Sequence, residues 1–123
     1  PGGWSGDQVN AFDDIGLSSL QTETKSFVKK LLNWRRSSKA VAHGKLIHYP
    51  VTNGIYVYFR VYHQDKLMVV MNNKENTEMV NLDIYRETFE DKNNGVDIIS
   101  GKKYNLSKDL ILNPKTALIL ELD

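Results

Sequence analysis

Residues 55–72, IYVYFRVYHQDKLMVVMN, decide the fold of this chain. Residues 55–62 and 66–72 have the composition of β-strands, and the three residues between them are short enough for a hairpin. The first strand is apolar on one face, and its other face carries Tyr56, Tyr58, Arg60 and Tyr62. The second strand is apolar on both faces. Strands with one face in water alternate more cleanly, so we expect two central strands that are covered on both sides. A second sheet covers one face, and a helix or a neighbouring domain covers the other.

Further strands are predicted before and after this hairpin in the sequence. Six stretches have strand character and are separated by turn signals: residues 45–51, 78–84, 96–100, 103–107, 110–113 and 116–122. Residues 85–95 are expected to hold a short helical turn. About eight short strands at this spacing are typical of an antiparallel sandwich or barrel. The strands come after the helical segment and do not alternate with helices, which argues against a doubly wound parallel sheet.

One amphipathic α-helix is predicted before the strands, over residues 22–36 (TETKSFVKKLLNWRR), after a loop-like start at residues 1–21. Its apolar face consists of Phe27, Val28, Leu31, Leu32 and Trp34. Thr22 or Thr24 could cap its start, and Glu23 would suit the first turn. Arg35 falls inside the apolar arc. It either extends its charged end to solvent or forms an ion pair with a carboxylate elsewhere.

Composition excludes several classes of function. A length of 123 residues suits one domain. The absence of cysteine excludes disulfides and thiolate metal sites. A net charge of +1 gives no electrostatic signature for nucleic acid, and no apolar run approaches the ~20 residues of a membrane helix. We therefore expect no nucleic-acid or membrane partner. Because the chain starts without methionine, we expect it to be a soluble piece of a longer polypeptide.

No metal, cofactor or catalytic group is predicted. His43, His48 and His63 do not have metal-ligand spacing, and no serine lies in a nucleophile-elbow context. Residues 91–97 (DKNNGVD) superficially resemble a calcium loop. Their glycine comes one position early, however, and Lys102 stands where the bidentate glutamate would fall. A turn is therefore the better interpretation.

Aromatic residues leave one binding function open. Five of them could stack on sugar rings: Trp4, Trp34, Tyr56, Tyr58 and Tyr62. Core packing explains Trp34 better, because it lies on the apolar face of the helix. The alternate tyrosines of residues 55–62 fit either a sheet face that packs on another element or a binding surface.

Several ordered motifs carry a resemblance to a known family. They are PGGWSGDQVNAF (1–12), FVKKLLNWRRSSKAVAHGKLIHYPVTNGIYVYFR (27–60), LMVVMNN (67–73), ISGKKYNLS (99–107) and TALILEL (116–122). Together they resemble the C-terminal end of the neopullulanase and cyclomaltodextrinase group of the α-amylase family, glycoside hydrolase family 13. The most specific parts are PGGW-x-GD-x-x-NAF and LLNWR ahead of HGK.

The resemblance implies a domain organisation. In that family a (β/α)₈ barrel precedes a smaller antiparallel β-sandwich. Residues 1–44 would be the remnant of the barrel, with its last loop and last helix, and residues 45–123 the sandwich. Because active sites of barrels lie on the face formed by such loops, Trp4, Asp7 and Asn10 would border the substrate cleft. The family's catalytic Asp, Glu and Asp lie on strands outside this sequence, so no residue here inherits their roles.

The function implied by the resemblance is structural. The parent enzyme would cleave α-1,4-glucans such as starch, maltodextrins and cyclodextrins, in the periplasm or cytoplasm of a bacterium. This chain would be non-catalytic and would pack against the catalytic barrel of the same polypeptide. The alternative is a carbohydrate-binding module that stacks glucan on surface tyrosines (Tyr56, Tyr58 and Tyr62) or on tryptophan. With its helix face uncovered, the piece is expected to self-associate.

Overall fold

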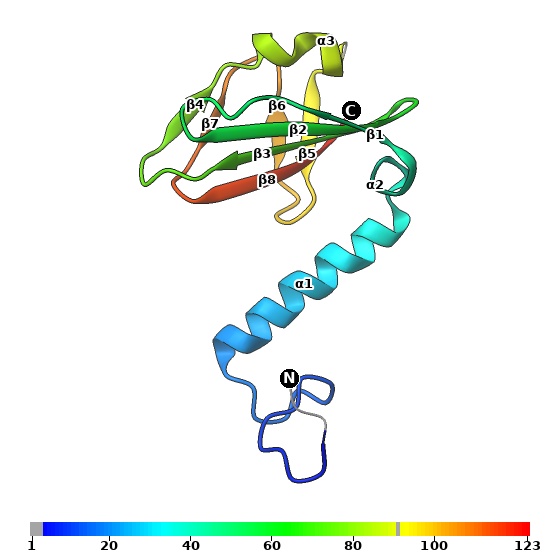
Figure 1. Ribbon diagram of the computed structural model, residues 1–123, viewed down its shortest axis with the longest axis vertical. Coiled ribbons are helices and arrows are strands. Elements are labelled where there is room, and N and C mark those ends of the chain that lie inside the picture. Colours follow the sequence, from blue (N-terminus) through cyan, green and yellow to red (C-terminus); the bar gives the residue numbers. More distant parts are fainter. Residues whose placement is uncertain (1–3, 91) are drawn as a thin grey trace. The chain divides into compact units, whose positions relative to one another are not determined.

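The computed structural model describes residues 4–90 and 92–123 (Figure 1). Residues 1–3 of the PGGW stretch and Asp91, the first position of the calcium-like loop, lie outside the described residues. The chain divides into two compact units, unit 1 (residues 1–36) and unit 2 (residues 37–123).

Unit 1 consists of a loop and the helix α1 (Ser19–Ser37), which confirms the predicted helix and extends it by three residues at its start. Its first turn is closed by a reciprocal pair of hydrogen bonds. The Gln21 amide donates to the Ser18 hydroxyl at 3.3 Å, and the Ser18 amide donates to Gln21 Oε1 at 2.8 Å. This capping box satisfies two amides that the helix itself leaves without partners.

The capping predictions were therefore wrong. The hydroxyls of Thr22 and Thr24 donate to the carbonyls of Ser18 and Leu20, one turn back, instead of accepting from free amides. The first turn of α1 contains no acidic residue, so Glu23 does not occupy it either. The physical reason is the glutamine at position 21, whose side chain moves the start of the helix towards the N-terminus.

Unit 2 contains, in the residues that the structure describes, eight strands in two antiparallel sheets. The strands are β1 (Lys45–His48), β2 (Ile55–Tyr62), β3 (Asp65–Asn72), β4 (Glu78–Val80), β5 (Asn94–Asp97), β6 (Lys103–Asn105), β7 (Leu110–Leu112) and β8 (Thr116–Leu122). Six form one sheet in the order β1-β2-β3-β8-β5-β6, and β4 pairs with β7. This confirms a mainly β fold of the antiparallel sandwich type, preceded by a loop and one long helix.

In the six-stranded sheet, side chains of neighbouring strands lie opposite one another and form rows across the strands. Val57 of β2 pairs with Val70 of β3, which pairs with Leu118 of β8. The next row joins Phe59, Met68 and Leu120, all with no exposed surface. These rows face β4, β7 and a short helical segment. The core comprises Ile55, Val57, Phe59, Met68, Val70, Val80, Leu82, Tyr85, Phe89, Leu106, Leu110, Leu112, Leu118, Leu120 and Leu122.

The prediction that β2 and β3 are central strands is confirmed. Each has a neighbour on both sides, and β3 is buried on both faces, since Leu67 and Val69 of its other face are buried as well. The helix α2 (Lys39–His43) packs against β2 and β3. Arg60 of β2 holds it there, because its guanidinium donates to the carbonyls of Ala40 and Val41.

The short helical turn predicted within residues 85–95 is confirmed as α3 (Arg86–Phe89), which the 3-10 helix η1 (Asp83–Tyr85) directly precedes. Several strand boundaries were wrong. The strands predicted over 45–51 and 103–107 end at His48 and Asn105. The strand predicted over 78–84 ends at Val80, where the chain turns towards η1. The strand predicted over 96–100 is β5 instead, which ends at Asp97 because the Gly101 amide donates to the Asp97 carbonyl and closes a turn.

None of the helices in the described ranges is long and apolar enough to cross a membrane.

Candidate functional site

The loop that precedes α1 is held by backbone turns in which two of the predicted site residues take part. Trp4 and Asp7 lie together: the Trp4 amide donates to Asp7 Oδ2 at 3.0 Å, and the Asp7 amide donates to the Trp4 carbonyl at 3.2 Å. Gly6, between them, has a φ of +92°, a conformation that glycine adopts without strain. This turn leaves the Trp4 side chain 84% exposed. An indole so exposed is free to contact another surface.

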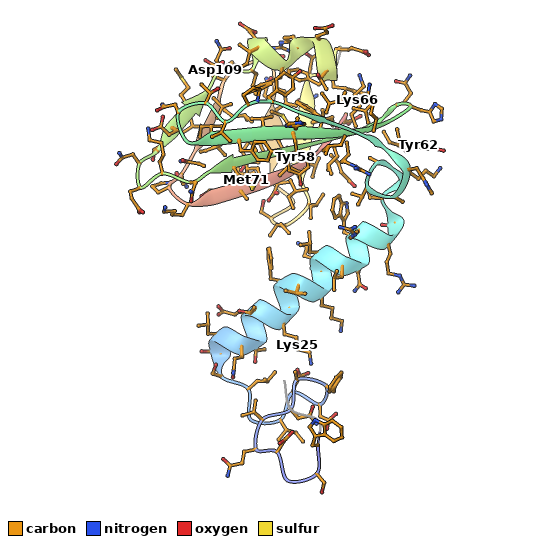
Figure 2. All side chains as sticks on the ribbon, viewed as in Figure 1. Lys25, Tyr58, Tyr62, Lys66, Met71 and Asp109 are labelled. Atoms are coloured by element: carbon orange, nitrogen blue, oxygen red, sulfur yellow. The ribbon has the colours of Figure 1, made fainter. Side chains whose placement is uncertain are left out.

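The third predicted residue of this loop, Asn10, belongs to the next turn. Its Oδ1 accepts from the Phe12 amide at 2.8 Å, its Nδ2 donates to Asp13 at 2.7 Å, and its amide donates to the Ile15 carbonyl. With both side-chain atoms occupied in this way, Asn10 shapes the loop. Asp14 forms an ion pair with Lys25, which ties the loop to α1 within unit 1 (Figure 2).

The three predicted stacking tyrosines lie on one face of β2, but they do not form one surface. The rings of Tyr56 and Tyr58 are 5.7 Å apart and inclined by 40°. Tyr62 lies at the other end of the strand, beside α2 (Figure 2), and packs against His43 and His63. All three side chains are half-buried. A flat platform for a row of sugar rings would need exposed and roughly coplanar rings.

Sequence reasoning missed an open groove of about 560 Å³ in unit 2. Its walls come from β1, β2, the β2–β3 turn and α3, and they consist of Ile47, Tyr49, Val61, His63, Gln64, Lys66, Glu87, Thr88 and Glu90. Lys66 is 6% exposed, and its Nζ donates to the Thr88 carbonyl at 3.1 Å and to Glu90 at 2.9 Å. No local pattern could have revealed this groove, because its residues are spread over more than forty positions.

Two buried ionisable groups have shifted pKa values, and both are explained by packing. Burial by itself would raise the pKa of Asp97, but hydrogen bonds from Ser100, Ile119 and Ile99 outweigh it, so that the pKa lies below its ordinary value. Burial, together with the neighbouring Tyr49, raises the pKa of Tyr85. Neither residue lines the groove. These shifts therefore give no sign of a catalytic acid or base.

No group of three or more His, Cys, Asp or Glu side chains in the described part of the chain could hold a metal ion. His43 and His63 both contact the Tyr62 ring instead. All buried side-chain nitrogen and oxygen atoms of the described residues have hydrogen-bond partners.

Comparison with known families gives one match that covers most of the chain. Residues 46–121 match the model of the cyclo-malto-dextrinase C-terminal domain. The matched range starts within β1 and ends within β8, so it contains β2 to β7 in full and all but one residue of β1 and of β8.

Solved structures share this fold. The chain is similar to AmyP in complex with maltose (19% identity, TM-score 0.74), over 88% of this chain and 22% of that one. It is similar to an Anoxybacillus α-amylase (23%, TM-score 0.71) over 81% of this chain and 22% of that one. It also resembles the isomaltulose synthase of Klebsiella sp. LX3 (23%, TM-score 0.64) over 80% and 17%. The chain spans about a fifth of the length of these proteins.

Proposed function

The chain belongs to the cyclo-malto-dextrinase C-terminal domain family, and on this premise we propose that it is a non-catalytic part of an α-amylase-type glycoside hydrolase of family 13. Its role is to pack against the catalytic barrel of the same polypeptide and to stabilise it. The parent enzyme acts on α-1,4-glucans such as starch, maltodextrins or cyclodextrins. In this proposal residues 1–44 are the last loop and last helix of the barrel, and residues 45–123 are the sandwich.

The observation that carries the proposal is the apolar face of α1, which its own unit leaves exposed. No residue of this helix is buried, and Phe27, Val28 and Leu32 are 47%, 43% and 53% exposed. Burying a side chain of this kind contributes about 1.5–3 kcal/mol, so an exposed row of them favours association with another surface. A barrel whose last helix is α1 would supply that surface.

The loop before α1 supports the same assignment. A loop that precedes the last helix of a barrel lies on the face that holds the active site. We therefore propose that Trp4, Asp7 and Asn10 border the substrate cleft of the parent enzyme. In this arrangement Trp4 contacts the sugar, while Asp7 and Asn10 hold the two turns that present it.

A carbohydrate-binding module is the alternative function. It would stack glucan on Tyr56, Tyr58 and Tyr62 or on an exposed tryptophan. The inclined rings of Tyr56 and Tyr58, and the contacts of Tyr62 with two histidines, favour packing over sugar binding.

The packing role is tested by the association of the 123-residue chain. We expect its mass in light scattering to rise with concentration and a hydrophobic dye to bind. The double variant Phe27→Gln/Leu32→Gln should reduce both signals. Lys29→Gln, on the polar side of α1, is the matched control and should leave both unchanged. A chain that stays monomeric and binds no dye would contradict an uncovered barrel-facing surface.

A further inference from the structure

Two Asn-Gly pairs occur in the sequence, Asn53-Gly54 and Asn94-Gly95, and the fold places them in different surroundings. In such a pair the glycine nitrogen can attack the asparagine side chain, because glycine has no Cβ to hinder its approach. We propose that Asn53-Gly54 is a site of spontaneous covalent modification. Asn53 is converted through a cyclic imide into aspartyl and isoaspartyl residues, whereas Asn94 is protected by the sheet.

The reaction needs only water. A bond forms between the Gly54 nitrogen and Asn53 Cγ, the bond from Cγ to the carboxamide nitrogen breaks, and the Gly54 amide proton leaves with that nitrogen as ammonia. Water then opens the five-membered imide at one of its two carbonyl carbons. Opening at Cγ yields aspartate in an ordinary backbone, and opening at the main-chain carbonyl yields isoaspartate. One water is consumed, one ammonia is released, and no electrons are transferred.

The attacking nitrogen is not engaged in the turn. Asn53 and Gly54 form a two-residue turn with φ values of +50° and +75°. The turn is closed by the amides and carbonyls of Thr52 and Ile55, which bond to each other at 2.9 and 3.0 Å. Asn53 is exposed, and within the described residues the Gly54 amide donates no hydrogen bond. The nitrogen therefore has no hydrogen bond of its own to break as it moves towards Cγ, while the Gly54 carbonyl accepts from the Asn73 amide at 3.1 Å.

The ammonium group of Lys74 lies beside Asn53 Oδ1, the oxygen on which negative charge develops during the attack. The stem of Lys74 crosses Gly54 so closely that a Cβ there would lie 2.6 Å from Lys74 Cγ. The Lys74 ammonium donates to Asn53 Oδ1 at 3.3 Å. When the nitrogen attacks, this oxygen becomes anionic, and the ammonium stabilises it as a preorganised donor does in an oxyanion hole. Glu78, which pairs with Lys74, accepts from Asn53 Nδ2, the nitrogen that leaves.

The second pair lacks this freedom. Asn94 and Asp123 exchange backbone hydrogen bonds at 2.9 and 3.2 Å. Gly95 is buried and paired with Leu122 of β8 on one side and with Tyr104 of β6 on the other. Rotating the Asn94–Gly95 backbone for attack would break both ladders. The reaction there requires local opening of the sheet.

The experiment follows both positions in one sample. The 123-residue chain is incubated at mildly alkaline pH, and peptide mass spectrometry with isoaspartate detection follows Asn53 and Asn94. A synthetic peptide of residues 50–57 confirms that the conditions permit the reaction. We expect isoaspartate at position 53, and conversion at 94 at least about tenfold slower, the factor given by about 1.4 kcal/mol of opening free energy. Asn53→Gln should abolish the mass change at position 53, because its ring closure would have six members.

Lys74→Met keeps the length of the stem and removes the charge. We expect it to slow conversion of Asn53 while Asn94 is unaffected. If Asn53 stays intact while the peptide reacts, or if Asn53 and Asn94 convert at equal rates in the folded chain, the proposed site is wrong. If Lys74→Met leaves the rate unchanged or raises it, the assigned role of Lys74 is wrong.

Discussion

The Asp97 carboxylate lies 2.6 Å from the Ser100 hydroxyl and 2.9 Å from the Ser100 amide, both through Oδ2. Its other oxygen, Oδ1, accepts from the Ile119 amide of β8 at 3.2 Å. Asp97 thus closes the turn after β5 and joins it to the central part of the sheet, although its side chain is almost fully buried. A charged acceptor with several donors explains why its pKa is lowered despite burial.

The interaction of Asp97 with Ser100 predicts how the stability of the fold changes with pH. Because the pKa of Asp97 is lower in the folded than in the unfolded state, its stabilising contribution is present above the unfolded value of about 3.9. It is lost as the pH falls through the folded value. Urea unfolding from pH 7 to pH 2 should show a loss of stability in acid that Asp97→Asn lacks.

The same variant should be less stable at pH 7, by about 2 kcal/mol, because a hydrogen bond to a charged group contributes about 1.5–3 kcal/mol. Asp65→Asn, at the start of β3 in the same sheet, removes an exposed carboxylate and serves as the control. If the unfolding free energy of Asp97→Asn falls in parallel with that of the unmodified chain down to pH 2, Asp97 does not cause the acid sensitivity.

A second prediction concerns Lys66, which anchors α3 by donating to the Thr88 carbonyl and to Glu90. Lys66→Met removes a charged donor from the Thr88 carbonyl in a half-buried position and should cost about 1–3 kcal/mol of unfolding free energy. Amide exchange of Glu90, which bonds to the Arg86 carbonyl, should accelerate.

Glu90→Gln is the matched change on the partner. Its side chain is mostly exposed, and exposed ion pairs contribute about 0–1 kcal/mol, so we expect a small effect. If Lys66→Met and Glu90→Gln lose equal amounts of unfolding free energy, the ion pair holds α3, and not the hydrogen bond from Lys66 to the Thr88 carbonyl.

A third prediction compares two glycines. Gly44 joins α2 to β1, and a Cβ there would lie 2.2 Å from the Ala40 carbonyl oxygen, so the backbone must move. Gly101 has open space around it but a φ of +74°. We expect Gly44→Ala to cost about 2 kcal/mol or more through overpacking. Gly101→Ala should cost about 1–2 kcal/mol through backbone strain. Chemical unfolding of both variants shows which one loses more unfolding free energy. A smaller loss for Gly44→Ala than for Gly101→Ala would contradict the close packing of α2.

The strands and the helix could be predicted from the sequence because their patterns are local. Residues 55–72 are long, apolar and free of glycine and proline, so the two central strands follow from composition alone. The end of β5 could not be predicted, because it depends on where the Asp97 side chain finds its donors, one of which lies in β8. Likewise, the start of α1 depends on the pairing of Gln21 with Ser18 and not on the threonines.

The candidate site stays a prediction. Trp4, Asp7 and Asn10 were expected to border a substrate cleft, and the structure adds that the Trp4 side chain is exposed. The arrangement of the tyrosines could not be predicted, because alternation places side chains on a face without fixing their ring angles. The groove around Lys66 depends on contacts between distant segments, which no single stretch of sequence encodes.

The last prediction separates packing from sugar binding. If the tyrosines of β2 serve packing, titration of maltoheptaose against the 123-residue chain should give no saturable signal, and Tyr58→Ala should leave that baseline unchanged. The physical reason is geometric: the inclined and half-buried rings of Tyr56 and Tyr58 offer no flat surface to the apolar face of a glucose unit. Calorimetry or tyrosine fluorescence measures the binding. Saturable binding that disappears in Tyr58→Ala but persists in Trp4→Ala would establish the binding module, and the packing role of this face would have to be abandoned.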